Sequence, residues 1–119
     1  MPSADSRLRV RKQDAVVQVE FIDRNILDEA NIQLISDEIS RIIDQESAPR
    51  LLISFANVDH LSSAALGALI TINNRVRNKT GQLRLAAIDP QIYEVFVITR
   101  LNKLFQIHET VDDAMKSFS

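Results

Sequence analysis

The sequence predicts an α/β domain with a mostly parallel sheet of four to five strands, an N-terminal β-hairpin and four helices. Segments with strand and helix patterns alternate along the chain, and this order is typical of a parallel sheet covered by helices. Residues 51–55 form a nearly continuous apolar run, as expected for a central strand that is buried on both faces. The 119 residues fit one domain, which we place at 7–119 after a disordered N-terminus at 1–6.

The hairpin and the first helix are predicted from two different periodicities. Apolar and polar residues alternate over 7–12 and 15–22, around a turn at Gln13-Asp14. After the loop 23–27, Asp28 is a favourable N-cap for a helix over 29–46. Isoleucines recur in this helix at the three- and four-residue spacing of an amphipathic stripe. They are Ile32, Ile35, Ile39 and Ile42.

The second helix is expected to run from the pair Ser62-Ser63 to about Asn78, where Thr80-Gly81 ends it. Four of the five residues after the serines are small, namely Ala64, Ala65, Gly67 and Ala68. A glycine inside a helix costs about 1 kcal/mol relative to alanine. Two explanations of this glycine remain open, a close contact with a partner and close packing of the helix on the sheet.

The last third of the chain carries explicit helix-start signals. A strand at 83–87 precedes Asp89 and Pro90, which are typical of an N-cap and a first helical position. A short edge strand is predicted at 104–107. Thr110, with an acidic residue three positions later, resembles a capping box for a final helix.

Composition and charge restrict the possible functions. The formal net charge of -2 gives no general attraction to nucleic acid or to an anionic membrane. The basic residues Arg7, Arg9, Arg11 and Lys12 are expected to mark the solvated face of a strand. The absence of cysteine excludes disulfides and thiol catalysis and fits a reducing compartment. No apolar run approaches the roughly 20 residues of a membrane span, so we expect a cytoplasmic protein.

Little in the sequence points to catalysis, a metal or a cofactor. His60 lies two residues before Ser62 and could approach a serine hydroxyl, although a histidine in such a loop is more often a packing residue. His108 is expected to be a connector residue. No metal-ligand spacing is present, and two glycines leave no room for a glycine-rich nucleotide loop. We therefore expect neither metal nor cofactor.

The serine pair is the main candidate for regulation. Ser62 as an N-cap contributes about 1 kcal/mol to the stability of its helix, and capping alone could explain the pair. Phosphorylation is the alternative. It would add about -1.5 to -2 charge units, which a helix N-terminus tolerates well. A docked partner, rather than the domain itself, would then experience the new charge.

Together these residues resemble the STAS domain of bacterial anti-sigma factor antagonists. In that family a strand ends in a turn with the pattern Asp-Ser-Ser/Thr-Gly-Leu-Gly, which opens a helix. The matching stretch is 62–67, with Ser62 in place of the aspartate and Ala65 in place of the first glycine. Residues 58–61 match the apolar approach to this turn, and 104–114 match the family's closing pattern.

The resemblance implies a protein that binds a kinase-type anti-sigma factor and so frees a sigma factor. That anti-sigma factor serine kinase would phosphorylate Ser63, or as a second choice Ser62, and a phosphatase would reset the cycle. The antagonist itself would be neither an enzyme nor a nucleic-acid binder, and it would not insert into a membrane. The docking surface would centre on 57–67, helped by the loop 23–27. Its residues would be Asp23, Arg24, Asn25, Asn57, Asp59, His60, Ser62, Ser63, Ala64, Leu66 and Gly67.

The sequence leaves two alternative functions open. The first is a STAS scaffold that is not phosphorylated, for example a subunit of a regulatory assembly or of a lipid-transport complex. The second is a small serine-dependent hydrolase or ligand binder that uses Ser62, Ser63 and His60.

Overall fold

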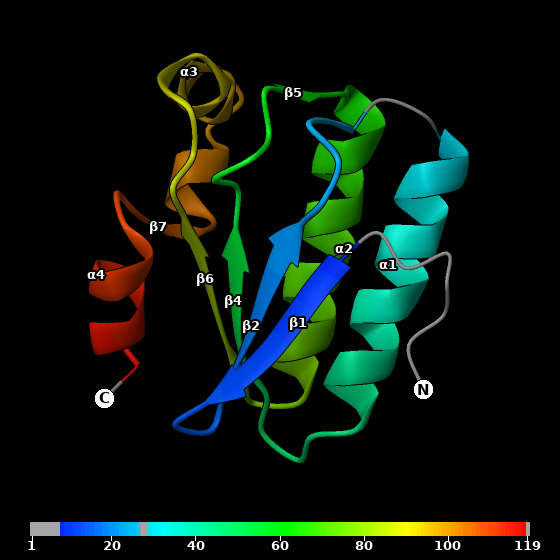
Figure 1. Cartoon of the computed structure of the whole chain (residues 1–119), viewed down its shortest axis with the longest axis vertical. Helices are drawn as coiled ribbons and strands as arrows, with labels where there is room; N and C mark the ends of the chain where they lie inside the picture. The colour runs from blue at the N-terminus through cyan, green and yellow to red at the C-terminus, as the bar shows by residue number, and fades with distance from the viewer. Residues whose placement is uncertain (1–7, 27–28, 119) are drawn as a thin grey trace.

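A computed structural model describes residues 8–26 and 29–118 of the chain. The predicted disordered segment 1–6, Arg7 and the predicted N-cap Asp28 lie outside the described residues. The main sheet has five strands in the order β1-β2-β4-β6-β7 (Figure 1). These strands are β1 (Leu8–Gln13), β2 (Val16–Phe21), β4 (Arg50–Ser54), β6 (Gln82–Ala86) and β7 (Gln106–His108).

The helices confirm the predicted α/β fold class. Within the described residues they are α1 (Glu29–Asp44), α2 (Ser63–Asn78), α3 (Pro90–Ile98), the 3-10 turn η1 (Leu101–Lys103) and α4 (Val111–Lys116). All neighbouring strands of the main sheet pair in parallel except β1 and β2, which form the predicted antiparallel hairpin. The apolar strand β4 lies at the centre of the sheet, between β2 and β6.

The hairpin turn lies one residue later than predicted. Gln13 pairs with Val16, so the turn residues are Asp14 and Ala15 rather than Gln13-Asp14. Both have positive φ, 52° and 65°, as a two-residue turn requires if it is to match the twist of the strands. An alanine in this left-handed conformation is uncommon, which is why the sequence pattern placed the turn too early.

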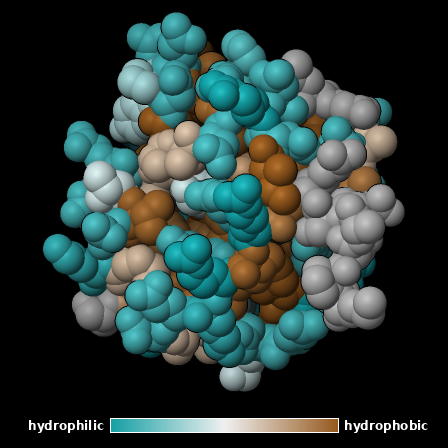
Figure 2. Space-filling model, viewed as in Figure 1, coloured by the Kyte–Doolittle hydropathy of each residue, from teal (hydrophilic) through white to brown (hydrophobic). Residues whose placement is uncertain are grey.

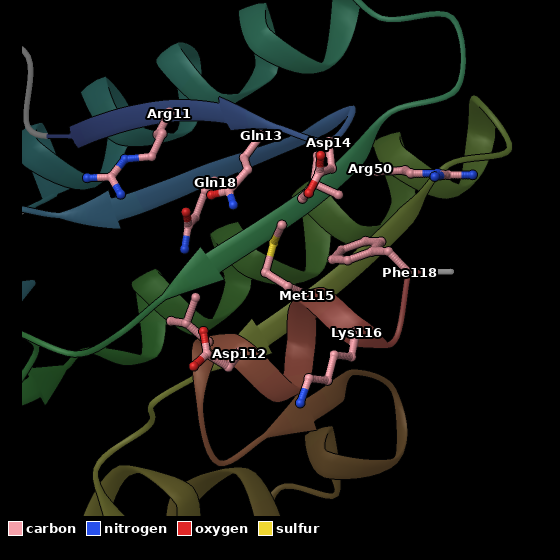
Figure 3. A pocket seen from close by; sticks show the side chains of 11 residues that line it. Arg11, Gln13, Asp14, Gln18, Arg50, Asp112, Met115, Lys116 and Phe118 are labelled. Atoms are coloured by element: carbon pink, nitrogen blue, oxygen red, sulfur yellow. The ribbon is translucent and has the colours of Figure 1, made fainter.

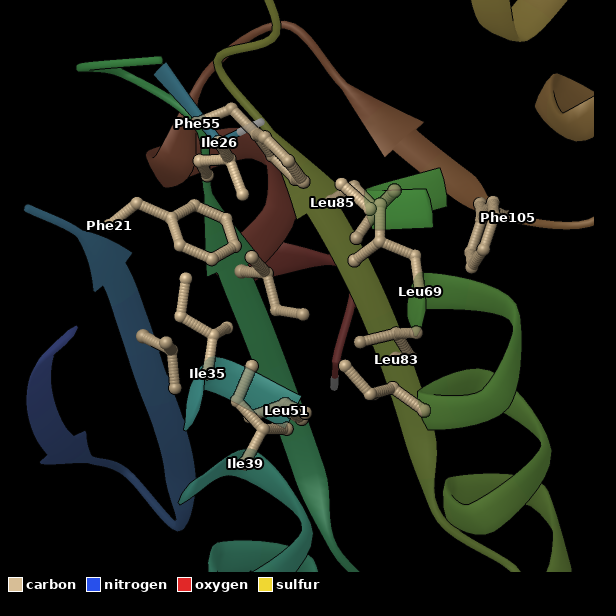
Figure 4. Close-up of a cluster of buried hydrophobic side chains, with 14 of the residues drawn as sticks. Phe21, Ile26, Ile35, Ile39, Leu51, Phe55, Leu69, Leu83, Leu85 and Phe105 are labelled. Carbon is tan, nitrogen blue, oxygen red and sulfur yellow. The ribbon is translucent and has the colours of Figure 1, made fainter. Parts of the chain in front are cut away.

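The main core lies between the sheet and the pair α1 and α2, which pack against each other (Figure 1). Figure 4 shows aromatic and aliphatic side chains from the strands and helices converging there, with the rings of Phe21 and Phe55 5.2 Å apart. The buried isoleucines of α1 are Ile32, Ile35, Ile39 and Ile43. The predicted stripe was therefore wrong at its last member, because Ile43 continues the buried row and Ile42 is only partly buried.

The short helix α4 covers part of the opposite face of the sheet. Ala114 and Phe118 pack there against Val16, Leu52 and Ala86. The guanidinium of Arg84 lies 5.0 Å from the centre of the Phe118 ring and donates to the Ser117 hydroxyl at 2.9 Å. Burial lowers the pKa of Arg84 from its ordinary value.

The basic residues of β1 do not form one patch, and all three that the structure describes are exposed, as expected. Figure 2 shows hydrophilic side chains around a central strip of apolar ones on this face. Arg9 lies 3.6 Å from Glu20, and Lys12 lies 3.0 Å from Glu46. Arg11 instead faces a groove of about 540 Å³ between the sheet and α4 (Figure 3). Acidic as well as basic side chains line this groove, so it does not favour an anionic ligand.

Thr80 and Gly81, which follow α2, have different structural roles. Thr80 takes the left-handed conformation, with φ of 53°, and the N–H of Gly81 donates to the carbonyl of Val76 at 2.9 Å. A β-branched residue in this conformation is strained. Gly81 does not have positive φ. Instead it lies so close to Pro49 that an added Cβ would be 2.3 Å from the Pro49 carbonyl oxygen.

Thr80→Gly is expected to raise the free energy of unfolding by about 1 kcal/mol, because glycine relieves the left-handed strain. The melting temperature should rise by about 3–6 °C. The matched control is Thr99→Gly at the C-cap of α3, where φ is -86° and glycine should lower stability. Denaturant unfolding of both variants checks the prediction, and a loss of stability in Thr80→Gly would contradict it.

Candidate functional site

Two loops far apart in the sequence are joined beside the start of α2. The two-residue strands β3 (Asn25–Ile26) and β5 (His60–Leu61) pair in parallel, with Asn25 opposite His60. The N–H of Asp59 donates to the carbonyl of Arg24 at 2.7 Å, and the N–H of Ser62 donates to that of Ile26 at 3.1 Å. Figure 1 shows β5 directly before the first turn of α2. The expected proximity of the loops 23–27 and 57–67 is therefore confirmed for the residues that the structure describes.

The side chains of these loops form a polar, charged surface. The guanidinium of Arg24 donates to a carboxylate oxygen of Asp59 at 2.8 Å, and the Arg24 side chain is largely exposed while that of Asp59 is partly exposed. Such an exposed ion pair adds little stability, but it holds the arginine across the two loops. Asn57 donates to the carbonyl of Phe21 at 3.5 Å, and Asp23 is half-buried. Asn25 and His60 are exposed.

Ser62 is the N-cap of α2, as predicted. It has extended backbone, and its hydroxyl oxygen accepts the N–H of Ala65 at 3.2 Å. Its carbonyl accepts the N–H of Leu66 at 3.1 Å, and its side chain is partly buried. The hydroxyl of Ser62 therefore already satisfies one of the otherwise unpaired donors of the helix.

Ser63 differs from its neighbour in both exposure and hydrogen bonding. It is the first residue of α2 and is exposed. Among the described residues, no hydrogen bond to its hydroxyl is found. The group is therefore free to react or to meet a partner without any loss of capping.

The small residues of α2 divide between the surface and the core. Ala64 and Gly67 are exposed, whereas Ala65 and Leu66 are buried. Leu66 belongs to the core, so this predicted contact residue is not presented to a partner. A Cβ on Gly67 would meet nothing within 4 Å. Close packing on the sheet therefore does not explain this glycine, and that explanation was wrong.

A groove of about 670 Å³ runs between α1 and α2 beside the first turn of α2. On α2 it is lined by Ala64, Ala68 and Thr71, and on α1 by Glu29, Ala30, Ile32, Gln33 and Ser36. The sequence does not predict the α1 residues of this groove, because only helix–helix packing brings them next to Ala64 and Ala68. The i, i+4 pair Ala64 and Ala68 was the one signal available, since small residues at this spacing leave a depression on a helix.

Neither a catalytic nor a metal-binding arrangement is found in the part of the chain that the structure describes. His60 and His108 make no hydrogen bond to Ser62 or Ser63 there. No group of three or more histidine, cysteine, aspartate or glutamate residues gathers there to hold a metal ion. Within the same residues no helix is long and apolar enough to cross a membrane.

Comparisons with known proteins agree with this fold. BtrV of Bordetella bronchiseptica, a candidate anti-sigma factor antagonist, is 23% identical over 95 residues, which cover 80% of this chain and 81% of BtrV. An anti-sigma factor antagonist from Mycobacterium paratuberculosis superposes with a TM-score of 0.81 at 25% identity, over 98% of this chain and 97% of that one. The Bacillus cell fate determinant SpoIIAA in its phosphorylated form gives 0.72 at 15% identity, over 94% and 99%. The STAS domain model matches residues 7–114, and the chain therefore belongs to the STAS domain family.

Proposed function

We propose that this STAS domain is an anti-sigma factor antagonist that acts in the cytoplasm and is controlled by phosphorylation of Ser63. It binds a kinase-type anti-sigma factor and thereby releases a sigma factor. The observation that carries the proposal is the free, exposed hydroxyl of Ser63 in the first turn of α2, beside the joined strands β3 and β5. The names of BtrV and of the mycobacterial structure support the same activity.

The docking surface consists of the two joined loops and the exposed residues of the first turns of α2. It includes the predicted contact residues except Leu66, together with the groove between α1 and α2. The Arg24–Asp59 ion pair and the exposed His60 give this surface polar groups that can select a partner. The exposed small residues Ala64 and Gly67 let the partner approach the helix backbone.

The hydrogen bonds favour Ser63 over Ser62 as the modified residue. Phosphorylation of Ser62 would disturb the bond between its oxygen and the Ala65 N–H, whereas Ser63 can be modified without loss of the cap. A phosphate on Ser63 would lie near the N-terminus of a 16-residue helix, where negative charge is favourable. The domain therefore tolerates the charge, and the penalty falls on the bound partner.

Residues 62–67 depart from the family motif at three positions, Ser62, Ala64 and Ala65, and the changes at the cap and at position 65 are compatible with this role. Serine caps a helix about as well as aspartate does, and Ser62 makes the expected capping bond. Ala65, which stands in place of a glycine, is buried, so its methyl group does not obstruct a partner on the outer face of α2.

The proposed cycle needs no catalytic group from this chain. The kinase transfers the γ-phosphoryl group of ATP to Oγ of Ser63, the hydroxyl proton is lost, and ADP is released. A phosphatase later hydrolyses the phosphoserine with water and restores the free hydroxyl. This chain binds, presents the serine and responds to the added charge.

Incubation of the purified protein with ATP and a cognate anti-sigma kinase tests the proposal. Intact and peptide mass spectrometry should find one phosphate, on Ser63, and none in Ser63→Ala. The Ser62→Ala variant, which loses about 1 kcal/mol of capping, should still be phosphorylated. Tight binding of the kinase without any phosphate would contradict the switch and favour the scaffold alternative, and a phosphate on Ser62 would contradict the choice of residue.

A further inference from the structure

The helix α3 is apolar on nearly all sides but is covered on only one. Ile92 and Phe96 are buried and pack into the main core. The other apolar side chains of the helix are Tyr93 (40% exposed), Val95 (42%), Val97 (45%) and Ile98 (79%). A helix that is apolar all round is normally buried all round, so this exposed face is expected to be covered by another molecule.

One charged residue lies on each side of Val97 in the chain, Glu94 within α3 and Arg100 just after its C-cap, with left-handed backbone. Glu94 and Arg100 lie three positions before and after Val97, and both are exposed. Within the described part of the chain neither side chain has a hydrogen-bond or ion-pair partner. A partner that covers Val97 and Ile98 therefore meets one unpaired negative and one unpaired positive group, on opposite sides of Val97.

We propose that a second copy of this chain covers the exposed face of α3 in a two-fold symmetric dimer. A two-fold axis near Val97 would place the last turns of the two α3 helices antiparallel, so that Glu94 in the helix of one copy faces the segment after the C-cap of the other, where Arg100 lies. Glu94 of each copy then pairs with Arg100 of the other, and the apolar side chains meet between the two pairs. This surface is thus complementary to itself, as a two-fold interface requires.

The charges beside the exposed face of α3 favour a second copy of the chain over a membrane. The small size of the interface indicates a weak dimer. A membrane would have to accommodate the carboxylate of Glu94 among the apolar side chains, which is costly, whereas a second copy supplies the matching guanidinium. Leu104, at the C-cap of η1, is a further exposed apolar residue in the segment that follows α3, with 38% exposure. One helix and a short turn form an interface at the small end of the specific range, so we expect a dissociation constant of about 1–100 μM.

Sedimentation equilibrium over a concentration series tests the dimer and needs no anti-sigma factor. The unchanged protein should show a monomer–dimer equilibrium. Ile98→Asp should weaken the dimer at least about 30-fold, because it places a charge at the centre of the interface. Leu34→Asp, at an exposed apolar residue of α1, is the matched control and should leave the dimer unchanged. Thermal unfolding shows whether each variant is folded.

The two charge pairs allow a rescue experiment, whose expected result could not arise from unfolding of a variant. Glu94→Arg alone and Arg100→Glu alone each place like charges opposite each other, and each should weaken the dimer about 10-fold or more. An equimolar mixture of the two variants restores both pairs, so the mixture should dimerise as well as the unchanged protein. A monomer at all concentrations, or a dimer insensitive to Ile98, Glu94 and Arg100, would overturn the proposal. Binding of the monomer to phosphatidylglycerol/phosphatidylcholine vesicles through Ile98 would also overturn it, in favour of a membrane.

Discussion

The Ser63→Asp variant is expected to bind its anti-sigma factor about 10- to 100-fold more weakly than the unchanged protein, whereas Ser63→Ala binds normally. The carboxylate places a permanent negative charge where the proposed phosphate would be, within the docking surface. A charge in an interface without a matching partner costs several kcal/mol. Alanine removes the hydroxyl but adds no charge, and this hydroxyl has no hydrogen bond to lose among the described residues. Isothermal titration calorimetry measures both affinities.

Two controls separate a binding defect from a folding defect. Ser63→Asp places an acidic residue in the first turn of α2, where it interacts favourably with the helix dipole, so its melting temperature should be unchanged or slightly raised. Asn78→Asp adds the same charge to an exposed residue at the other end of α2 and should not change the affinity. Equal affinities of Ser63→Asp and Ser63→Ala would show that the surface around Ser63 is not the docking site.

The features that the sequence predicted well are those set by neighbouring residues. Asp89 and Thr110 cap α3 and α4 as expected, through hydrogen bonds of 2.8 Å from the N–H of Gln91 and 3.1 Å from the N–H of Asp113. The central strand β4 was recognisable because both of its faces are apolar. Ser62 and Ser63 could be placed at the start of a helix because a polar turn, a capping residue and an apolar helical segment follow one another directly in the chain.

The features that were missed depend on contacts between distant segments. The strands β3 and β5 have two residues each, too few for a periodic pattern, and each exists because of the other. The predicted edge strand at 104–107 begins later, as β7, because Leu104 instead ends the turn η1. The α1 wall of the groove and the approach of Gly81 to Pro49 likewise become visible only when the chain is folded.

The two glycines of the chain are expected to respond to alanine with opposite signs. At Gly81 the new Cβ would lie 2.3 Å from the carbonyl oxygen of Pro49 and 2.8 and 2.9 Å from its ring carbons. Backbone must move to admit it, since the N–H of Gln82 also donates to that carbonyl at 2.8 Å. We expect Gly81→Ala to lower the free energy of unfolding by about 2–3 kcal/mol.

At Gly67 the same substitution should stabilise the protein. The residue lies inside α2, is exposed and leaves open space for a Cβ, so alanine should gain about 1 kcal/mol from helix propensity alone. Denaturant unfolding of the two variants under the same conditions checks both signs. A loss of stability in Gly67→Ala would contradict the open space at this position, and a gain in Gly81→Ala would contradict the close approach to Pro49.

Gly67→Ala is also expected to weaken binding of the anti-sigma factor by about 10-fold, even though it stabilises the fold. Gly67 lies one helical turn after Ser63 on the exposed side of α2. A closely packed interface resists one added methyl group, as a protein core does. The matched control is Asn74→Ala, two turns further along the same helix and also exposed, which should gain stability without losing affinity. If Gly67→Ala keeps full affinity, the interface does not reach the second turn of α2. A Gly67→Ala variant that is more stable but binds more weakly would instead show that this glycine serves partner binding and lowers the stability of the helix.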